Sequence, residues 1–551
     1  MKKIRTITIL LAMLFFCQQG IAQIQKAAKA VFTLTTFDKD GGILASSHGV
    51  FVSADGDAIS TWTPFVGASS AVVIDASGHK MNVKDMLGAN EIYDVCKFKV
   101  DGRTTAAPIA QSPSPVNSKV WLIGYSLDKP AISQRSVQKV EEFMDKYAYY
   151  IFSDNAPDNA SSCPFVNQKG EVIGLLQHSK TGGELYATDA RFINSFKIEK
   201  GLSINDAVLR QTGIRMALPN QLDEATLALM LSAQTVDSIK RAGYVNDFIL
   251  KFPQSTEGYY RRATDYVNQN LFDQAATDME NCIRNATAKD EAHFCYSKLI
   301  YDKEIYKSQI PYQAWSLDKA LEEARKAYEI NPYPIYLHQQ AKIIYTQKDF
   351  SKAYDLFMAL TKTPIRNGEL FYSAAQCKMQ QNAPQNEILA LLDSAVYAQQ
   401  KTNSAPYYLA RGQYLALIGE TRKAVEDFNV YDTLVIGHGS PDFYYVKYQC
   451  EVKLHRYQQA LNDIAHAIVL NRAEPTYYAE MANLQIKINK PEDAIKTIDI
   501  CISLAPEYAD AYLIKGLALI QNKQVADGIK QLQKAKDLGD PRAQELIDKY
   551  K

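Results

Sequence analysis

The chain contains few cysteines for its length, eight among 551 residues, and no two of them form a Cys-x-x-Cys pair. Beyond Cys17, the remaining seven are an odd number, scattered without the spacing of a disulfide framework or of a metal site. We therefore expect small buried side chains at these positions, no metal site and no organic cofactor. Cys282 and Cys295 are the two that would be tested first for a bridge.

An excess of charge of one sign is also absent, because 61 Lys and Arg balance 61 Asp and Glu. A surface that binds nucleic acid needs a basic excess, so we expect no nucleic-acid partner. After the N-terminal segment, no stretch approaches the roughly 18 apolar residues of a membrane span. The hydrophobic share of 47% is that of a globular protein. At roughly 150 residues per domain, the length predicts three or four domains, or fewer if one part is a repeat array.

Residues 1–22 differ in character from the rest of the chain. A basic start is followed by an apolar run over residues 6–16 and by the small-residue exit Gly20-Ile21-Ala22. This is the pattern of a secretory signal peptide, so we expect the mature chain to begin near Gln23 with 58 basic and 61 acidic residues, a net charge of about -3. The alternative, a lipoprotein signal ending at Cys17, is disfavoured because the bulky Phe16 precedes it. The expected location is the periplasm or the cell envelope.

The C-terminal half repeats itself at a period near 34 residues. Starts at Pro441, Pro475 and Ala509 lie 34 apart, the fourth position is always tyrosine, and the eighth and twentieth positions are mostly Ala or Gly. A second apolar stripe follows in each period, so each unit is expected to be a pair of helices. Small residues are needed where paired helices approach most closely.

This pattern resembles the tetratricopeptide repeat, and the resemblance covers more than half of the chain. In the same phase, five further units start at Thr256, Asp290, Pro334, Gly368 and Ala405, the second with about ten extra residues around 308–314. The predicted organisation is a signal peptide (1–22), a β-domain (23–200), a helical linker or degenerate repeat (201–255), a solenoid of about eight repeats (256–542) and the end of a capping helix (543–551).

The resemblance implies a concave wall, lined by the first helix of each unit, that binds an extended peptide or a partner protein. Positions two, five, nine and twelve face this groove in the family. Its predicted lining is aromatic and amide-rich, and includes Tyr260, His338, Tyr345, Tyr372, Gln376, Tyr445, Gln449 and Asn483.

Residues 23–200 follow a different pattern, with short apolar runs bounded by Gly, Asp and Asn. We expect strands at 31–37, 49–53, 58–61, 71–74, 95–100, 119–124, 149–152 and 172–176. About 175 residues of this kind allow two small barrels.

Three segments in this region resemble the trypsin-like serine proteases of the HtrA/Deg type. They are residues 49–61 (GVFVSADGDAIST), 93–98 (YDVCKF) and 161–174 (SSCPFVNQKGEVIG). The fold class implied is an all-β trypsin-like double barrel, followed here by an all-α tetratricopeptide solenoid. By the resemblance, Asp94 falls on the catalytic aspartate and Ser161 on the nucleophile, whereas Thr63 stands where the family has its histidine.

The family's mechanism needs a histidine to take the proton of the serine hydroxyl. Threonine cannot act as a base near neutral pH, and the glycine-rich nucleophile loop is here Asn159-Ala160-Ser161-Ser162-Cys163. His48, His79 and His178 are the histidines that could substitute for the missing base, and we expect each of them to be an ordinary surface or strand-end residue.

The sequence therefore predicts an exported interaction scaffold, an inactive trypsin-like domain joined to a repeat array, with no cofactor. In this view the protease-like cleft retains peptide binding by strand addition. The main alternative is an active serine endopeptidase that uses Ser161 with a displaced base and recruits substrates through the repeats. A third reading makes the β-domain a structural cap and leaves all recognition to the solenoid. The sequence leaves the partner and the oligomeric state open.

Overall fold

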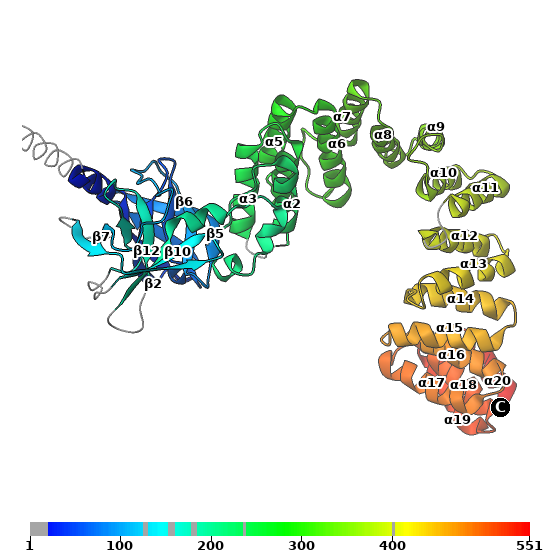
Figure 1. Cartoon of the computed structure of the whole chain (residues 1–551). Helices are drawn as coiled ribbons and strands as arrows, with labels where there is room; N and C mark the ends of the chain where they lie inside the picture. Colours follow the sequence, from blue (N-terminus) through cyan, green and yellow to red (C-terminus); the bar gives the residue numbers. More distant parts are fainter. Residues whose placement is uncertain (1–19, 125–129, 153–159, 178–183, 235–237, 399–402) are drawn as a thin grey trace, which may run out of the picture. The chain divides into compact units, whose positions relative to one another are not determined.

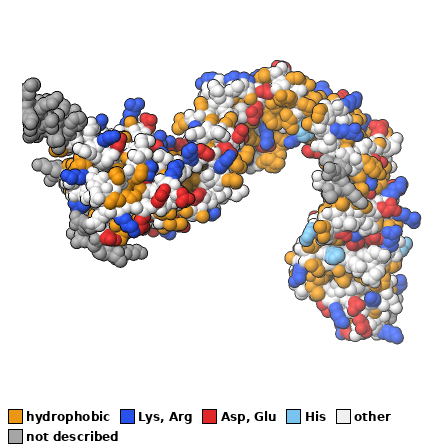
Figure 2. Space-filling view, viewed as in Figure 1, with side chains coloured by type: hydrophobic (Ala, Val, Ile, Leu, Met, Phe, Trp, Pro, Cys, Tyr) orange, Lys and Arg blue, Asp and Glu red, His pale blue; other side chains and the backbone are white. Residues whose placement is uncertain are grey.

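The structure is a computed structural model that describes residues 20–124, 130–152, 160–177, 184–234, 238–398 and 403–551. The chain divides into two compact units, Met1–Ala288 and Lys289–Lys551, and each is considered by itself (Figure 1). On the visible face, acidic and basic side chains are interspersed rather than gathered into a field of one sign (Figure 2).

The first unit begins with a closed antiparallel barrel in the order β1-β2-β3-β6-β5-β4, in which β4 pairs back to β1. Its strands alternate buried and more exposed residues, as expected for one face turned to a core. Phe32, Phe51 and Phe98 fill that core without exposure, with the rings of Phe32 and Phe51 4.5 Å apart. The strands are β1 (Val31–Phe37), β2 (Ile43–Phe51), β3 (Asp57–Ser60), β4 (Ser70–Ile74), β5 (Lys80–Asn90) and β6 (Val95–Val100).

A second sheet of seven strands follows in the order β8-β7-β11-β12-β13-β10-β9. It is an open sheet in the part of the chain that the structure describes, so the predicted pair of barrels consists of one closed barrel and one half-barrel. Its strands are β7 (Lys119–Gly124), β8 (Ala131–Ser136), β9 (Lys139–Phe143), β10 (Tyr147–Phe152), β11 (Pro164–Val166), β12 (Val172–Leu176) and β13 (Leu185–Asp189).

A hydrophobic layer joins the two sheets. It contains Val50 and Ile59 from the barrel and Val166 and Val172 from the second sheet. A helical segment at residues 20–28 adds Ile24 to the same layer. The predicted signal peptide lies almost wholly outside the described residues, as does Cys17, but the start of the expected mature chain is part of this core.

Short 3-10 helices and four α-helices complete the first unit. They are η1 (Thr63–Phe65), η2 (Ala190–Ser195), η3 (Gly201–Asn205), η4 (Leu209–Gln211), α2 (Leu222–Ser232), α3 (Ser238–Lys251), α4 (Thr256–Asn268) and α5 (Phe272–Asn285). Helices α2 to α5 thus group with the β-region in one compact unit. The predicted domain limits at 200 and 255 stay predictions.

The second unit consists of consecutive helix pairs. They are α6 (Lys289–Tyr306) with α7 (Leu317–Ile330), α8 (Pro334–Thr346) with α9 (Phe350–Leu360), α10 (Gly368–Gln380) with α11 (Gln385–Tyr397), α12 (Ala405–Leu417) with α13 (Thr421–Leu434), α14 (Pro441–Lys453) with α15 (Tyr457–Leu470), α16 (Pro475–Lys487) with α17 (Pro491–Leu504), and α18 (Ala509–Gln521) with α19 (Val525–Asp537). The last helix, α20 (Ala543–Tyr550), packs on α19.

The helix pairs keep the predicted phase. Seven of the eight predicted starts are the first residue of a helix, and the eighth, Asp290, is the second residue of α6. The small residues of the eighth position lie at close helix contacts, since a Cβ on Gly412 would meet the Phe428 ring at 2.7 Å, and one on Gly516 would meet Leu532 at 2.8 Å.

Among the described residues, no disulfide links any cysteines, Cys282 and Cys295 included.

A buried ion pair recurs at fixed positions of three units. The seventh residue is a cation and the twenty-third an aspartate, 16 residues later, in Arg262–Asp278, Arg411–Asp427 and Lys447–Asp463. Both arginines are bidentate, with N–O distances of 2.7–2.8 Å. Each cation also reaches the preceding helix pair, at Asn246, Asp393 and Asp432 respectively. These pairs tie the first helix of a unit both to its own second helix and to the second helix before it.

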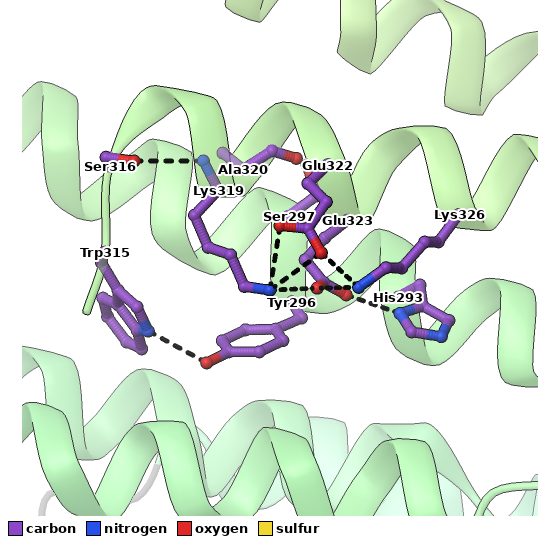
Figure 3. A network of polar contacts seen from close by, with 10 residues as sticks. All are labelled: His293, Tyr296, Ser297, Trp315, Ser316, Lys319, Ala320, Glu322, Glu323 and Lys326. Carbon is purple, nitrogen blue, oxygen red and sulfur yellow. Dashed lines mark hydrogen bonds and ion pairs between the residues drawn. The ribbon is translucent and has the colours of Figure 1, made fainter.

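The insertion between α6 and α7 is anchored by polar contacts (Figure 3). Trp315 Nε1 of the insertion donates to Tyr296 Oη at 3.0 Å, and beside it Ser297 Oγ on α6 donates to the Ala320 carbonyl on α7 at 2.7 Å. Nearby, the almost fully buried Glu323 accepts from His293 at 2.6 Å and pairs with two lysines at 2.9 and 3.1 Å (Figure 3); the lysines are Lys319 and Lys326. Burial alone would raise the pKa of Glu323, but these contacts outweigh it and lower the pKa to about 2.

Replacing Glu323 by glutamine is expected to destabilise the second unit by about 2–3 kcal/mol at pH 7. Because the folded pKa is depressed, the contribution is fully present above the unfolded pKa near 4.5 and is lost as the pH falls towards 2. Urea unfolding at pH 7 and pH 3 measures this difference, which should be clearly smaller at pH 3. The neighbouring Glu322→Gln is the control, since Glu322 contacts the same lysines from an exposed position and should cost less than about 1 kcal/mol. Equal costs for the two variants would contradict the prediction.

Candidate active site

Three predicted segments meet where the barrel and the second sheet face each other. Strand β3 ends at Ser60 and leads into η1, which begins at Thr63; Asp94 directly precedes β6; and Ser161 lies in the turn before β11. Buried Trp62 and Phe65 flank Thr63 and stack with ring centroids 6.2 Å apart. The side chain of Thr63 is thereby held at the surface between two anchored neighbours.

Thr63 donates two hydrogen bonds to the carboxylate of Asp94. The Thr63 amide donates to Asp94 Oδ1 at 2.7 Å, and the Thr63 hydroxyl donates to the same oxygen at 2.9 Å. Asp94 itself has a positive φ of 43°, which aspartate tolerates better than most residues. A hydroxyl that donates to a carboxylate orients it but cannot take a proton from a serine near neutral pH. The structure thus brings together the residues expected at the aspartate and histidine positions, without a base.

The turn around Ser161 has no glycine, but one of its residues adopts the positive φ that favours glycine. Ser162 is fully buried at a φ of 67°, and its hydroxyl lies 2.5 Å from the Thr61 hydroxyl at the end of β3. Its amide donates to the Leu176 carbonyl at 2.9 Å, and the next amide, of Cys163, donates to the Ala160 carbonyl at 3.1 Å. Both amides after Ser161 are therefore used inside the fold. Asn159, at the first position of this loop, lies outside the described residues.

His48, expected to be a surface or strand-end residue, lies inside strand β2 instead. It lies half-buried on β2, its ring hydrogen-bonds the backbone of Ser161, and its carbonyl accepts from the Ser60 hydroxyl at 2.5 Å. Burial lowers the pKa of His48, against a smaller opposite effect of the Ser161 contact, so the neutral ring is favoured. His79 is instead a turn residue beside Asp75, and His178 lies outside the described residues.

The predicted groove residues all lie on first helices and none is fully buried. They are Tyr260 on α4, His338 and Tyr345 on α8, Tyr372 and Gln376 on α10, Tyr445 and Gln449 on α14, and Asn483 on α16. Several rings pair with aromatic neighbours, for example Tyr372 with Tyr407 at 6.2 Å and Tyr445 with Tyr477 at 5.2 Å. Tyr260 belongs to the first compact unit and the others to the second, and their role in binding stays a prediction.

No protein-family profile and no curated protein sequence matches the chain. Solved structures match parts of it. YrrB, "a TPR protein with an unusual peptide-binding site", is 18% identical over 35% of this chain and 97% of its own, with a TM-score of 0.32. The active form of the Rv3671c protease from M. tuberculosis is 12% identical over 36% of this chain and 86% of its own, with a TM-score of 0.29. The HtrA-type protease AlgW with tripeptide is 17% identical over 34% of this chain and 64% of its own, also with a TM-score of 0.29.

The observed architecture, one closed barrel and one open sheet followed by consecutive helix pairs, confirms the fold class expected from the sequence, a trypsin-like β-domain followed by a tetratricopeptide solenoid. These likenesses say nothing about activity, which must be judged from the chain's own residues.

A cleft of about 680 Å³ lies away from this site, between the barrel and α3. Its charged residues pair with one another, as in Lys97–Asp57 at 3.0 Å and Lys84–Asp247 at 3.3 Å. Within the described ranges, no group of His, Cys, Asp or Glu is arranged to hold a metal ion, and no helix is long and apolar enough to cross a membrane.

Proposed function

We propose that this chain is an exported binding scaffold, in which the trypsin-like domain does not hydrolyse peptides and the tetratricopeptide array binds a peptide or protein partner in the periplasm or cell envelope. The observation that carries the proposal is the pair of hydrogen bonds from Thr63 to Asp94. They fill the place in which a catalytic histidine would be held.

The magnitude of the loss supports binding rather than catalysis. Removing the histidine of a serine-protease triad lowers turnover by about 10⁶, and what remains depends on an intact oxyanion hole. In a trypsin-like site the oxyanion hole is formed by the amide of the nucleophile and the amide of the residue two before it, here Ser161 and Asn159, and Asn159 lies outside the described residues. The replacement of the histidine by Thr63 and the absence of glycine from the turn around Ser161 support binding rather than acyl transfer.

A fluorophosphonate probe tests the inactive site directly, because it reacts with an activated serine and adds a defined mass. The native chain is expected to stay unlabelled after hours at pH 7.5 by intact-mass measurement, like the Ser161→Ala variant. Stoichiometric labelling of the native chain that Ser161→Ala abolishes would overturn the proposal.

Export is tested by the mass of the chain in the periplasmic fraction, which should correspond to a start at Gln23. An N-terminus at Met1, or a lipid on Cys17, would contradict soluble export.

A slow serine hydrolase is the second candidate, and the position of His48 favours it. Its ring contacts the Ser161 backbone, and its lowered pKa keeps it in the form that can accept a proton. In that case labelling would be present in the native chain, lost in Ser161→Ala and strongly reduced in His48→Ala. Labelling that His48→Ala leaves unchanged would exclude this base.

A further inference from the structure

One stretch of the tetratricopeptide array combines stacked tyrosines with carboxylates. It consists of Asp442, Tyr445 and Tyr448 on α14 and Tyr477 and Glu480 on α16, and is called here the tyrosine–carboxylate wall. The Tyr445 ring lies 5.2 Å from that of Tyr477 and 6.0 Å from that of Tyr448, almost parallel to the latter at 17°. Two consecutive first helices are thus joined by an aromatic cluster, in which Tyr448 and Tyr477 are buried and Tyr445 is half-buried.

Two of the three tyrosine hydroxyls of the wall are directed to its acids. Tyr448 donates to Glu480 Oε2 at 2.9 Å, and Tyr477 donates to Asp442 Oδ1 at 3.3 Å. Tyr448 stands at the eighth position, where the other phased units carry Ala, Gly or Ser, so this junction departs from the rule of small residues. Burial raises the pKa of Tyr445, as does the nearby charge of Glu480, which keeps the phenol neutral.

The carboxylates of the wall are not neutralised by the protein. In the described part of the chain, neither Asp442 nor Glu480 forms an ion pair with a lysine, arginine or histidine. The cation of the same helix, Lys447, is instead bound to Asp432 and Asp463 at 3.2 and 3.3 Å. Other acids of the array are paired, as Asp393 is with Arg411 at 2.6 Å. The wall therefore presents the half-buried ring of Tyr445 beside carboxylates that form no ion pair among the described residues.

We propose that the tyrosine–carboxylate wall binds a lysine or arginine side chain of an extended basic segment in the partner protein. A cation over a tyrosine face is attracted by the ring, and adjacent carboxylates add charge-assisted hydrogen bonds. Tyr445 is half-buried and Asp442 exposed, so both are accessible from solvent. The inference rests on the proposed function, because it names the chemistry of the partner held by the array.

The test measures fluorescence anisotropy of a labelled 12-residue Gly/Ser peptide carrying three lysines, against the same peptide with glutamines, titrated with the full purified chain. The lysine peptide is expected to bind about tenfold more tightly. Glu480→Gln and Tyr445→Ala should each weaken it at least about fivefold and remove most of the preference for lysine. Glu492→Gln, an exposed acid in the first turn of α17, is the matched control and should change nothing.

Several outcomes would overturn the proposal. They are equal affinity for the two peptides, no measurable binding of the lysine peptide, or lysine binding that both wall variants leave intact. Because Glu480→Gln alters one atom at a half-buried position, it keeps the test valid even if Tyr445→Ala unfolds α14. If both peptides bind equally, the basic-segment inference fails while the binding scaffold stands; fluorophosphonate labelling would overturn the scaffold without affecting the wall.

Discussion

Replacing Thr63 by histidine is expected to make Ser161 react with a fluorophosphonate at least about 10²-fold faster than in the native chain. The position is already prepared for an imidazole, because Thr63 is exposed and its neighbours Trp62 and Phe65 are anchored in the core. The Asp94 oxygen that accepts from the Thr63 hydroxyl at 2.9 Å would accept from the ring N–H instead. A correctly oriented imidazole is worth about 10² to 10⁴ in proton transfer.

Three measurements identify the cause of such a gain. The labelling rate of the Thr63→His variant should rise with pH through the usual pKa of histidine, near 6.5. Adding Ser161→Ala should abolish the labelling, and Thr63→Ala, which removes the hydroxyl without supplying a base, should show no gain. If Thr63→His reacts no faster than Thr63→Ala, the nucleophile turn rather than the missing base limits the site.

Replacing Arg411 by methionine is expected to lower the stability of the second unit by about 3–4 kcal/mol, and its Tm by roughly 5–10 °C. Arg411 holds Asp427 through two hydrogen bonds of 2.7 and 2.8 Å and reaches Asp393 at 2.6 Å. Methionine can fill the space of the stem but leaves the carboxylate of Asp427, which is 6% exposed, without a counter-ion. Breaking a buried pair from one side costs more than the pair contributes as a whole.

Calorimetry of the variant needs a control at the same repeat position. Lys515 also stands at position seven of its unit, but its partner Asp499 is half exposed, so Lys515→Met should cost less than about 1 kcal/mol. The double variant Arg411→Met/Asp427→Leu should recover most of the lost stability, because no charge is then left buried. An equal loss for Arg411→Met and Lys515→Met would contradict this account.

The helical half could be predicted closely from the sequence because its signals are local and repeated. A fixed phase placed the helix starts, and the tyrosine and small-residue positions follow from how neighbouring helices touch. What the phase does not give is the chemistry between units. The contact of Tyr448 with Glu480 depends on one residue that breaks the small-residue rule, and only the packed helices show where its hydroxyl ends.

The β-half was predicted less completely, for physical reasons that differ between strands. Strand β5 has irregular pairing between Val83 and Asp85 and again between Met86 and Gly88, so the period of two that indicates a strand is broken. Strands β8 and β9 end the second sheet and bury little, so they lack an apolar face that a sequence pattern could show.

The candidate site was predicted in its residues but not in its contacts. Order along the chain placed Thr63, Asp94 and Ser161 by resemblance. The bond between Thr61 and Ser162 spans 101 residues and the contact of His48 with Ser161 spans a similar separation, so no local pattern could reveal either.

The recurring pair of a cation at position seven and an aspartate at position twenty-three also constrains how the array can assemble. Units of similar size and pattern could dock incorrectly, with the first helix of one unit packed on the second helix of the following unit instead of on its own. If α14 packed in this way on α17, Lys447 would face Thr497, while Asp463 would be left facing Met481 of α16. A buried charge facing an uncharged partner is costly, so units with and without the pair are not interchangeable. The ion pairs therefore favour the correct order of units, because incorrect docking would leave a buried charge without its partner while the array folds.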